Sequence, residues 1–144
     1  IMREYCFKND ISFLHDGTFA NYETMQRMVK KSLDVGREVQ IFYIYLDPLV
    51  AWEFTQAREF LEGRNIIKEK FIDQFFASME NVEKIKEEFG NKVKVHCVLK
   101  SSKNEVESVR LNIPSIDNFL KMEYNRGSIR EYSKENLREA ISEL

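Results

Sequence analysis

The chain has 144 residues, 43% of them hydrophobic, and a formal net charge of −2. This composition is typical of one globular domain with its own core. The charge argues against binding nucleic acid by bulk electrostatics. No apolar stretch approaches the roughly 20 residues that a membrane span needs, and no signal-peptide pattern is present. Two distant cysteines indicate neither a disulfide framework nor a zinc knuckle, so we expect a cytoplasmic setting.

The first half of the chain predicts two strands and two helical segments. Residues 1–9 are typical of the last turns of a helix or of a loose lead-in. The apolar run Ile11–Leu14 has the length of a strand. Apolar residues at helical spacing predict a helix over about residues 21–35. The nearly continuous apolar run Val39–Leu46 predicts a parallel strand that is covered on both faces.

The second half begins with Asp47-Pro48, a pair that suits the start of a helix because Asp can cap it and Pro fits its first position. The segment Glu62–Asn65 interrupts that helix. The later expected elements are a long helix over 67–89, strands over 92–100 and 106–113, and a final helix capped by Ser133.

Strands that alternate with helices predict the α/β class, with a parallel sheet and flanking helices. Three main strands make a thin sheet, and further strands of such a domain are expected before residue 11. No internal repeat or linker divides the chain, so we interpret residues 1–144 as a single domain.

One candidate site is Asp16, which follows the apolar run Ile11–Leu14. A carboxylate at the carboxyl end of a parallel strand can hold Mg²⁺ or orient a hydroxyl beside a transferring phosphate. The alternative interpretation is an ordinary turn Asp before Gly17.

A second candidate is the break between the two central helices, which carries Arg58, Arg64 and Lys68. The guanidinium group offers a planar fork of donors that suits phosphate oxygens. A hinged helical segment with arginines can close over ATP and exclude water. The alternative is that these are solvated surface charges, and the neighbouring Gly63 favours Arg64 over Arg58 for a functional role.

A third candidate is the strand end near His96 and Cys97. Neighbouring strand residues face opposite sides, so this pair predicts no compact metal site. We interpret His96 as a residue with a local hydrogen bond and Cys97 as a buried small hydrophobe. Lys100 and Lys103 follow at the edge where ligands bind, and could contact a nucleotide base or phosphate.

The positions of the glycines argue against a phosphate-binding loop within these 144 residues. The chain has five, at positions 17, 36, 63, 90 and 127, and no Gly-x-x-x-x-Gly-Lys-Ser/Thr sequence. A phosphate cradle of backbone N–H groups needs such a loop. The 144 residues therefore do not make a complete P-loop kinase by themselves.

Taken in order, these pieces resemble the second half of the zeta-toxin family of P-loop kinases. The resemblance covers roughly residues 10 to 103 and implies a P-loop kinase-like three-layer fold without its N-terminal strands. Residues 104–144 resemble no motif and are an unassigned appendage. The segments that carry the resemblance are "FLHDGTF", "EVQIFYIYLDP", "AREFLEGRNIIKEKFIDQFFASMENVEKI" and "VKVHCVLKS".

The resemblance implies an ATP- and Mg²⁺-dependent phosphotransferase whose acceptor is a hydroxyl of a UDP-activated amino sugar, and which a cognate antitoxin protein holds inactive. By position, Asp16 matches the family's acidic residue near the acceptor and the metal. Thr18 matches a residue that contacts the acceptor. Arg64 and Arg58 match lid arginines that stabilise the transferring phosphoryl group. Lys68 matches a basic residue just after the lid.

The chain also departs from the family pattern. The family's phosphate loop and general-base Asp lie before this chain begins, and Asp16 stands where Glu is common. The usual lid Pro is at neither Ile66 nor Ile67. Because Ile1 precedes Met2, we interpret the chain as one that does not start at an initiator.

Three interpretations remain. The first is part of a kinase that is inactive without its N-terminal segment. The second is a non-catalytic remnant or interaction module that binds a protein partner or nucleotide. The third is an unrelated α/β domain.

Overall fold

The computed structural model describes residues 2–144, which form a mixed α/β domain built on a three-stranded sheet. The strands are β1 (Val39–Tyr45), β2 (Val93–Lys100) and β3 (Val106–Arg110), in that spatial order. β1 and β2 are parallel, as predicted, whereas β3 returns antiparallel to β2. The α/β fold class is confirmed.

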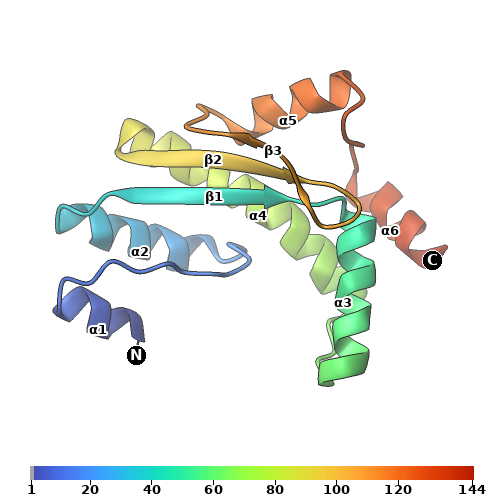
Figure 1. Cartoon of the computed structure of the whole chain (residues 1–144), viewed down its shortest axis with the longest axis horizontal. Coiled ribbons are helices and arrows are strands. Elements are labelled where there is room, and N and C mark those ends of the chain that lie inside the picture. Colours follow the sequence, from blue (N-terminus) through green and yellow to red (C-terminus); the bar gives the residue numbers. More distant parts are fainter. Residues whose placement is uncertain (1) are drawn as a thin grey trace.

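Within the described residues, six helices and a short 3₁₀ turn accompany the sheet (Figure 1). They are α1 (Met2–Lys8), α2 (Tyr22–Asp34), α3 (Pro48–Glu62), α4 (Lys68–Phe89), η1 (Gly90–Lys92), α5 (Ile116–Asn125) and α6 (Lys134–Ser142). The helices over residues 22–34, 48–62, 68–89 and 134–142 lie where the sequence predicts helices.

Local capping explains where several of these helices begin and end. The Asn21 side chain accepts the Thr24 N–H at 2.9 Å at the start of α2. Asp47 accepts the Leu49 N–H at 2.9 Å at the start of α3. Gly63 ends α3 with a φ of 68°, a left-handed conformation that glycine adopts without a steric penalty. Ser133 and Asn136 form a reciprocal capping box at the start of α6.

The main core lies between one face of the sheet and helices α2, α4 and α5. Alternate residues of the two parallel strands point into it, as the period of two for a strand requires. Ile72 is buried in a second, smaller cluster where α3, α4 and α6 meet. The strand residues of the main core are Ile41, Tyr43, Tyr45, Val93, Val95, Cys97 and Leu99.

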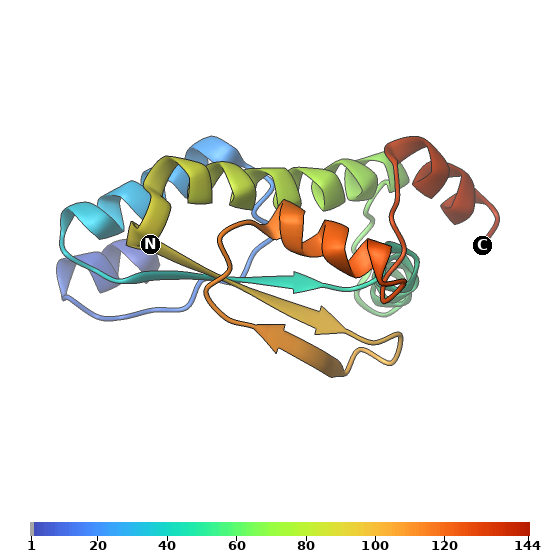
Figure 2. The same cartoon turned by 90° about the horizontal axis from the view of Figure 1, so that it is seen from above.

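The opposite face of the sheet is open. Figure 2 shows helices α2, α4 and α5 on the same side of the strands. On the other face, the Phe42 side chain is 54% exposed and that of Ile44 is 59% exposed. The prediction that β1 is covered on both faces is therefore wrong for residues 2–144, because its apolar pattern has no second layer to pack against.

The predicted strand over Ile11–Leu14 is also wrong, since this segment is irregular. In Figure 1 it runs between α1 and α2, and within residues 2–144 the β1 backbone pairs only with β2. The Ile11 N–H donates to the Cys6 carbonyl at 2.9 Å, and the Ile11 carbonyl accepts from Arg37 at 2.8 Å. Its backbone groups thus serve the end of α1 and an arginine, and no sheet ladder forms.

None of the helices in residues 2–144 has the length and apolarity to cross a membrane.

Candidate functional site

Asp16 and Thr18 lie in the irregular segment between α1 and α2, and both are exposed. Because residues 11–14 do not form a strand, Asp16 does not stand at the carboxyl end of a strand, which corrects the predicted geometry. The Thr18 hydroxyl accepts the Ala20 N–H at 3.4 Å. The Phe19 carbonyl accepts from Asn81 of α4 at 3.0 Å, which fixes this end of the segment to the core.

The Asp16 carboxylate makes no hydrogen bond and no ion pair with other described residues. It is therefore available to a ligand that approaches from solvent. Within residues 2–144, no group of three or more His, Cys, Asp or Glu side chains is placed to hold a metal ion.

Arg58 and Arg64 share one counter-ion, Glu62. Arg58 Nε lies 3.8 Å from one oxygen of Glu62, and Arg64 Nε lies 3.6 Å from the other. The arginine side chains are 70% and 77% exposed, so these long contacts contribute little to stability. The fold thus keeps both guanidinium groups at one place, where a stronger anion could replace Glu62.

The arginine loop (residues 63–67) joins α3 to α4 at the far end of α3 from the sheet (Figure 1). Large apolar side chains around it are uncovered: Phe60 is 91% exposed, Leu61 79% and Ile67 68%. In residues 2–144 no hydrogen bond or ion pair links the loop to Asp16. The structure therefore brings Arg58 and Arg64 together but leaves Asp16 apart from them.

The two candidate lysines have different surroundings. Lys68, in the first turn of α4, donates to the Ser142 hydroxyl of α6 at 2.8 Å. Lys100 is the last residue of β2, one residue after Leu99, which pairs with Tyr45 at the end of β1. Lys100 therefore lies at the carboxyl edge of the parallel strands, as predicted.

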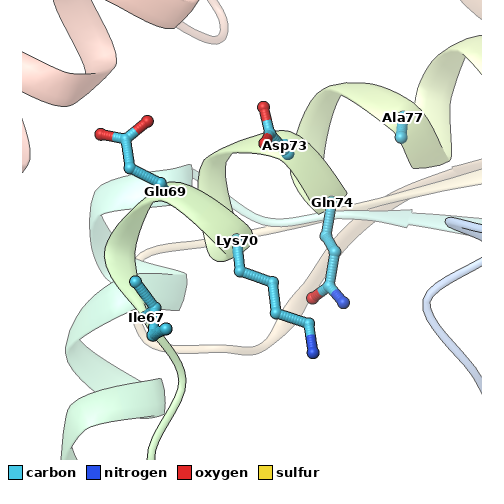
Figure 3. A pocket seen from close by; sticks show the side chains of 6 residues that line it. All are labelled: Ile67, Glu69, Lys70, Asp73, Gln74 and Ala77. Atoms are coloured by element: carbon cyan, nitrogen blue, oxygen red, sulfur yellow. The ribbon is translucent and has the colours of Figure 1, made fainter.

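A shallow hollow of about 400 Å³ opens on the flank of α4 beside the arginine loop (Figure 3). Lys70 and Gln74 extend to one side of the helix, and Glu69 and Asp73 to another. Glu69 and Asp73 are already paired with Arg138 and Lys134 of α6. The hollow thus offers an amine and an amide beside Ile67, the last residue of the arginine loop.

His96 and Cys97 have structural roles, in agreement with their interpretation from the sequence. His96 Nδ1 accepts the Asn112 N–H at 2.8 Å, and Nε2 lies 2.9 Å from Gln40 Oε1. Cys97 is completely buried in the core, and this burial raises the pKa of its thiol to about 12. Both described cysteines are free thiols.

Tyr132 contacts the start of α3, and no motif of the sequence points to it. Its hydroxyl donates to Asp47 Oδ2 at 2.9 Å, while Asp47 Oδ1 caps α3. Burial, together with this hydrogen bond, raises the pKa of Tyr132 to about 12. No local sequence signal pairs residues so far apart in the chain.

A family model described as Zeta toxin matches residues 2–112. The chain belongs to the zeta-toxin family. The match extends beyond residues 10–103 at both ends, so α1 and β3 are included, whereas α5 and α6 lie outside it. No curated protein and no solved structure matches the chain. Membership of the zeta-toxin family identifies a kinase-like toxin domain.

Proposed function

We propose that this zeta-toxin chain is part of an ATP-dependent small-molecule kinase that transfers a phosphoryl group to a hydroxyl of a UDP-amino sugar. The observation that carries the proposal is the family match, which spans the Asp16 segment, the arginine loop and Lys100. The paired exposed guanidinium groups of Arg58 and Arg64 support it, because such a pair suits a multiply charged phosphate.

In this proposal Asp16 and Thr18 contact the acceptor, and the Asp16 carboxylate also binds Mg²⁺. A single unpaired carboxylate fits that ion, which commonly takes one or two carboxylates and completes its octahedron with water and phosphate oxygens. Mg²⁺ bound with ATP neutralises charge on the phosphates. Asp16 orients the acceptor hydroxyl toward this charge-compensated phosphate.

The arginine loop acts as a lid. Arg64 and Arg58 leave Glu62 and bind the transferring phosphoryl group, while Lys68 contacts the acceptor and Lys100 contacts ATP. The loop must move toward Asp16 for this, and the left-handed Gly63 at its start is a suitable hinge. The exposed Phe60, Leu61 and Ile67 side chains become covered as the lid closes.

We further propose that this chain does not transfer phosphate on its own, because its 144 residues contain no Gly-x-x-x-x-Gly-Lys-Ser/Thr loop. A cognate antitoxin or a segment that supplies the phosphate loop is the expected protein partner. The two free cysteines support a cytoplasmic setting.

Ligand mapping by NMR on the ¹⁵N-labelled chain tests the proposal. We expect UDP-N-acetylglucosamine at millimolar concentration to shift the amide signals of residues 15–20, and Mg-ATP to shift those of residues 58–68 and 100. The Asp16→Asn variant should lose the first set of shifts and keep the second. Absence of both sets in the folded chain would contradict the proposal.

A second candidate function, a protein-interaction module, is favoured by the open face of the sheet. Phe42 and Ile44 are exposed there, and β1 carries no charged residue and an unpaired outer edge within residues 2–144. Uncharged free edges of this kind invite strand addition. A stable oligomer by analytical ultracentrifugation, without nucleotide-induced NMR shifts, would favour this function over the kinase.

A further inference from the structure

Residues 130–144, here called the C-terminal brace, lie outside the family match and contact both helices that bound the arginine loop. The brace contains the segment before α6 and α6 itself. Figure 1 shows α6 beside α3 and the first turns of α4. The brace contacts the first turns of α3 and of α4. Because α4 begins directly after the arginine loop, the contacts with α4 hold the second end of that loop.

The contact with α3 is made through its cap. Tyr132 donates to one oxygen of Asp47, and the other oxygen of that carboxylate receives the Leu49 N–H of the first turn. The Tyr45 hydroxyl at the end of β1 donates to the Arg130 carbonyl at 3.3 Å. The brace is therefore tied to the junction from which α3 departs.

The contact with α4 is polar and lies directly after the arginine loop. Arg138 makes a two-pronged pair with Glu69, with N–O distances of 2.7 and 3.0 Å. Lys134 Nζ lies 2.9 Å from Asp73. Lys68 donates to Ser142. Because Lys68 adjoins the loop, these pairs anchor its second end.

An apolar cluster lies beneath these pairs. Leu137 and Ile72 are fully buried and Ile141 is 5% exposed. The rings of Trp52 of α3 and Phe71 of α4 pack in the same cluster, with centroids 5.1 Å apart and planes tilted by 57°. The second half of α3 has no such support: Phe60 and Leu61 are largely exposed. The loop is thus fixed on its α4 side and free on its α3 side.

We propose that the C-terminal brace is a positioning device that holds the base of α3 and the start of α4, and so limits the motion of the arginine loop. Motion is then confined to the second half of α3 and to Gly63. The importance of this restraint for phosphoryl transfer rests on the proposed function, but the restraint itself does not.

Hydrogen–deuterium exchange on the ligand-free chain tests the brace. The double variant Lys134→Gln/Arg138→Gln removes its ion pairs with α4. We expect amides of residues 57–70 to exchange about five- to tenfold faster, as local opening becomes easier, while β1 and β2 stay unchanged. Trp52, the single tryptophan, reports whether α6 has separated, through a red shift of its emission.

The matched control is Lys121→Gln, which removes an exposed ion pair with Asp117 in α5, away from the loop. It should leave exchange at residues 57–70 unchanged. Tyr132→Phe, which removes one hydroxyl, is the milder second variant should the double variant fail to fold by circular dichroism. Unchanged exchange at residues 57–70 in a folded brace variant would overturn the proposal. Because no nucleotide is present, failure of the kinase proposal would not alter this result.

Discussion

Tyr132 and Asp47 lie 85 positions apart in the chain, and a hydrogen bond of 2.9 Å joins the tyrosine hydroxyl to the aspartate carboxylate. The same carboxylate caps α3, the helix that leads to the arginine loop. A residue outside the zeta-toxin match is thereby coupled to the helix that carries Arg58.

Removing this hydroxyl tests the coupling as a contribution to stability. We expect Tyr132→Phe to lower the free energy of unfolding by about 1–2 kcal/mol, since a partly buried carboxylate oxygen loses its donor. Urea denaturation followed by Trp52 fluorescence measures the change. Tyr5→Phe, in the exposed part of α1, is the control and should have no measurable effect. Equal stability of Tyr132→Phe and wild type would show that water replaces the hydroxyl at no cost.

The buried thiol of Cys97 predicts both low reactivity and sensitivity to alkali. Its pKa is raised to about 12 in the folded chain, against about 8.5 in an unfolded one. Below pH 8 the thiol is neutral in the folded and the unfolded chain, so its contribution to the free energy of unfolding does not change with pH there. Above that, ionisation stabilises the unfolded chain, so stability falls as pH rises from about 8.5 toward 12.

The check on Cys97 has two parts. A thiol reagent such as DTNB should label it in guanidinium chloride but only slowly at pH 7.5 in the native chain. In Cys97→Ala, the loss of stability between pH 8 and pH 10 should be smaller than in wild type. Rapid labelling of native Cys97 would be inconsistent with its burial.

Glu88 links α4 to α2, because its carboxylate accepts from the Tyr22 hydroxyl and from Gln26 at 2.8 Å. The Tyr22 hydrogen bond lowers the pKa of Glu88. A lowered pKa means that the carboxylate stabilises the fold above its unfolded pKa, and that this contribution disappears as the pH falls through the folded value.

We therefore expect Glu88→Gln to destabilise the chain at pH 7 and to have a smaller effect at pH 3. Urea denaturation at the two pH values measures this difference. The control is Glu87→Gln, the exposed neighbour that makes no such contact within residues 2–144. A penalty for Glu88→Gln that did not change with pH would exclude an ionic contribution.

Local features of the sequence predicted much of the fold. Asn21, Asp47-Pro48 and Gly63 mark helix ends through side-chain caps and a left-handed turn, which depend only on neighbouring residues. The parallel pair β1 and β2 followed from the alternation of strands with helices along the chain. The arginine-bearing break between α3 and α4 was likewise found in its predicted place.

The structural predictions that failed concerned features that depend on partners elsewhere in the chain. Ile11–Leu14 has the composition of a strand, but a strand also needs a neighbour, and Arg37 and Cys6 take the backbone groups of Ile11 instead. The prediction that β1 is covered on both faces failed for the same reason, since no second layer packs on Phe42 within residues 2–144. The bond from Tyr132 to Asp47 could not be predicted because no spacing rule connects positions so distant. The roles of all six candidate site residues remain predictions: Asp16, Thr18, Arg58, Arg64, Lys68 and Lys100.

The chain itself should show no magnesium-dependent ATP hydrolysis, since it lacks a glycine-rich phosphate loop. A coupled assay for ADP release, run with and without UDP-N-acetylglucosamine, measures this. Turnover that persists through purification and is lost in Arg64→Gln would show that residues 1–144 hold a complete site, against our expectation.

The central claim is that the arginine loop forms a phosphate-binding lid, and calorimetric titration of Mg-ATP tests it most directly. We expect weak binding by the folded chain, and an affinity at least about tenfold lower for Arg64→Gln, as loss of a charge-assisted contact predicts. The control Arg27→Gln, on the exposed side of α2, should bind like the wild type. Equal affinity for Arg64→Gln and Arg27→Gln would contradict the claim.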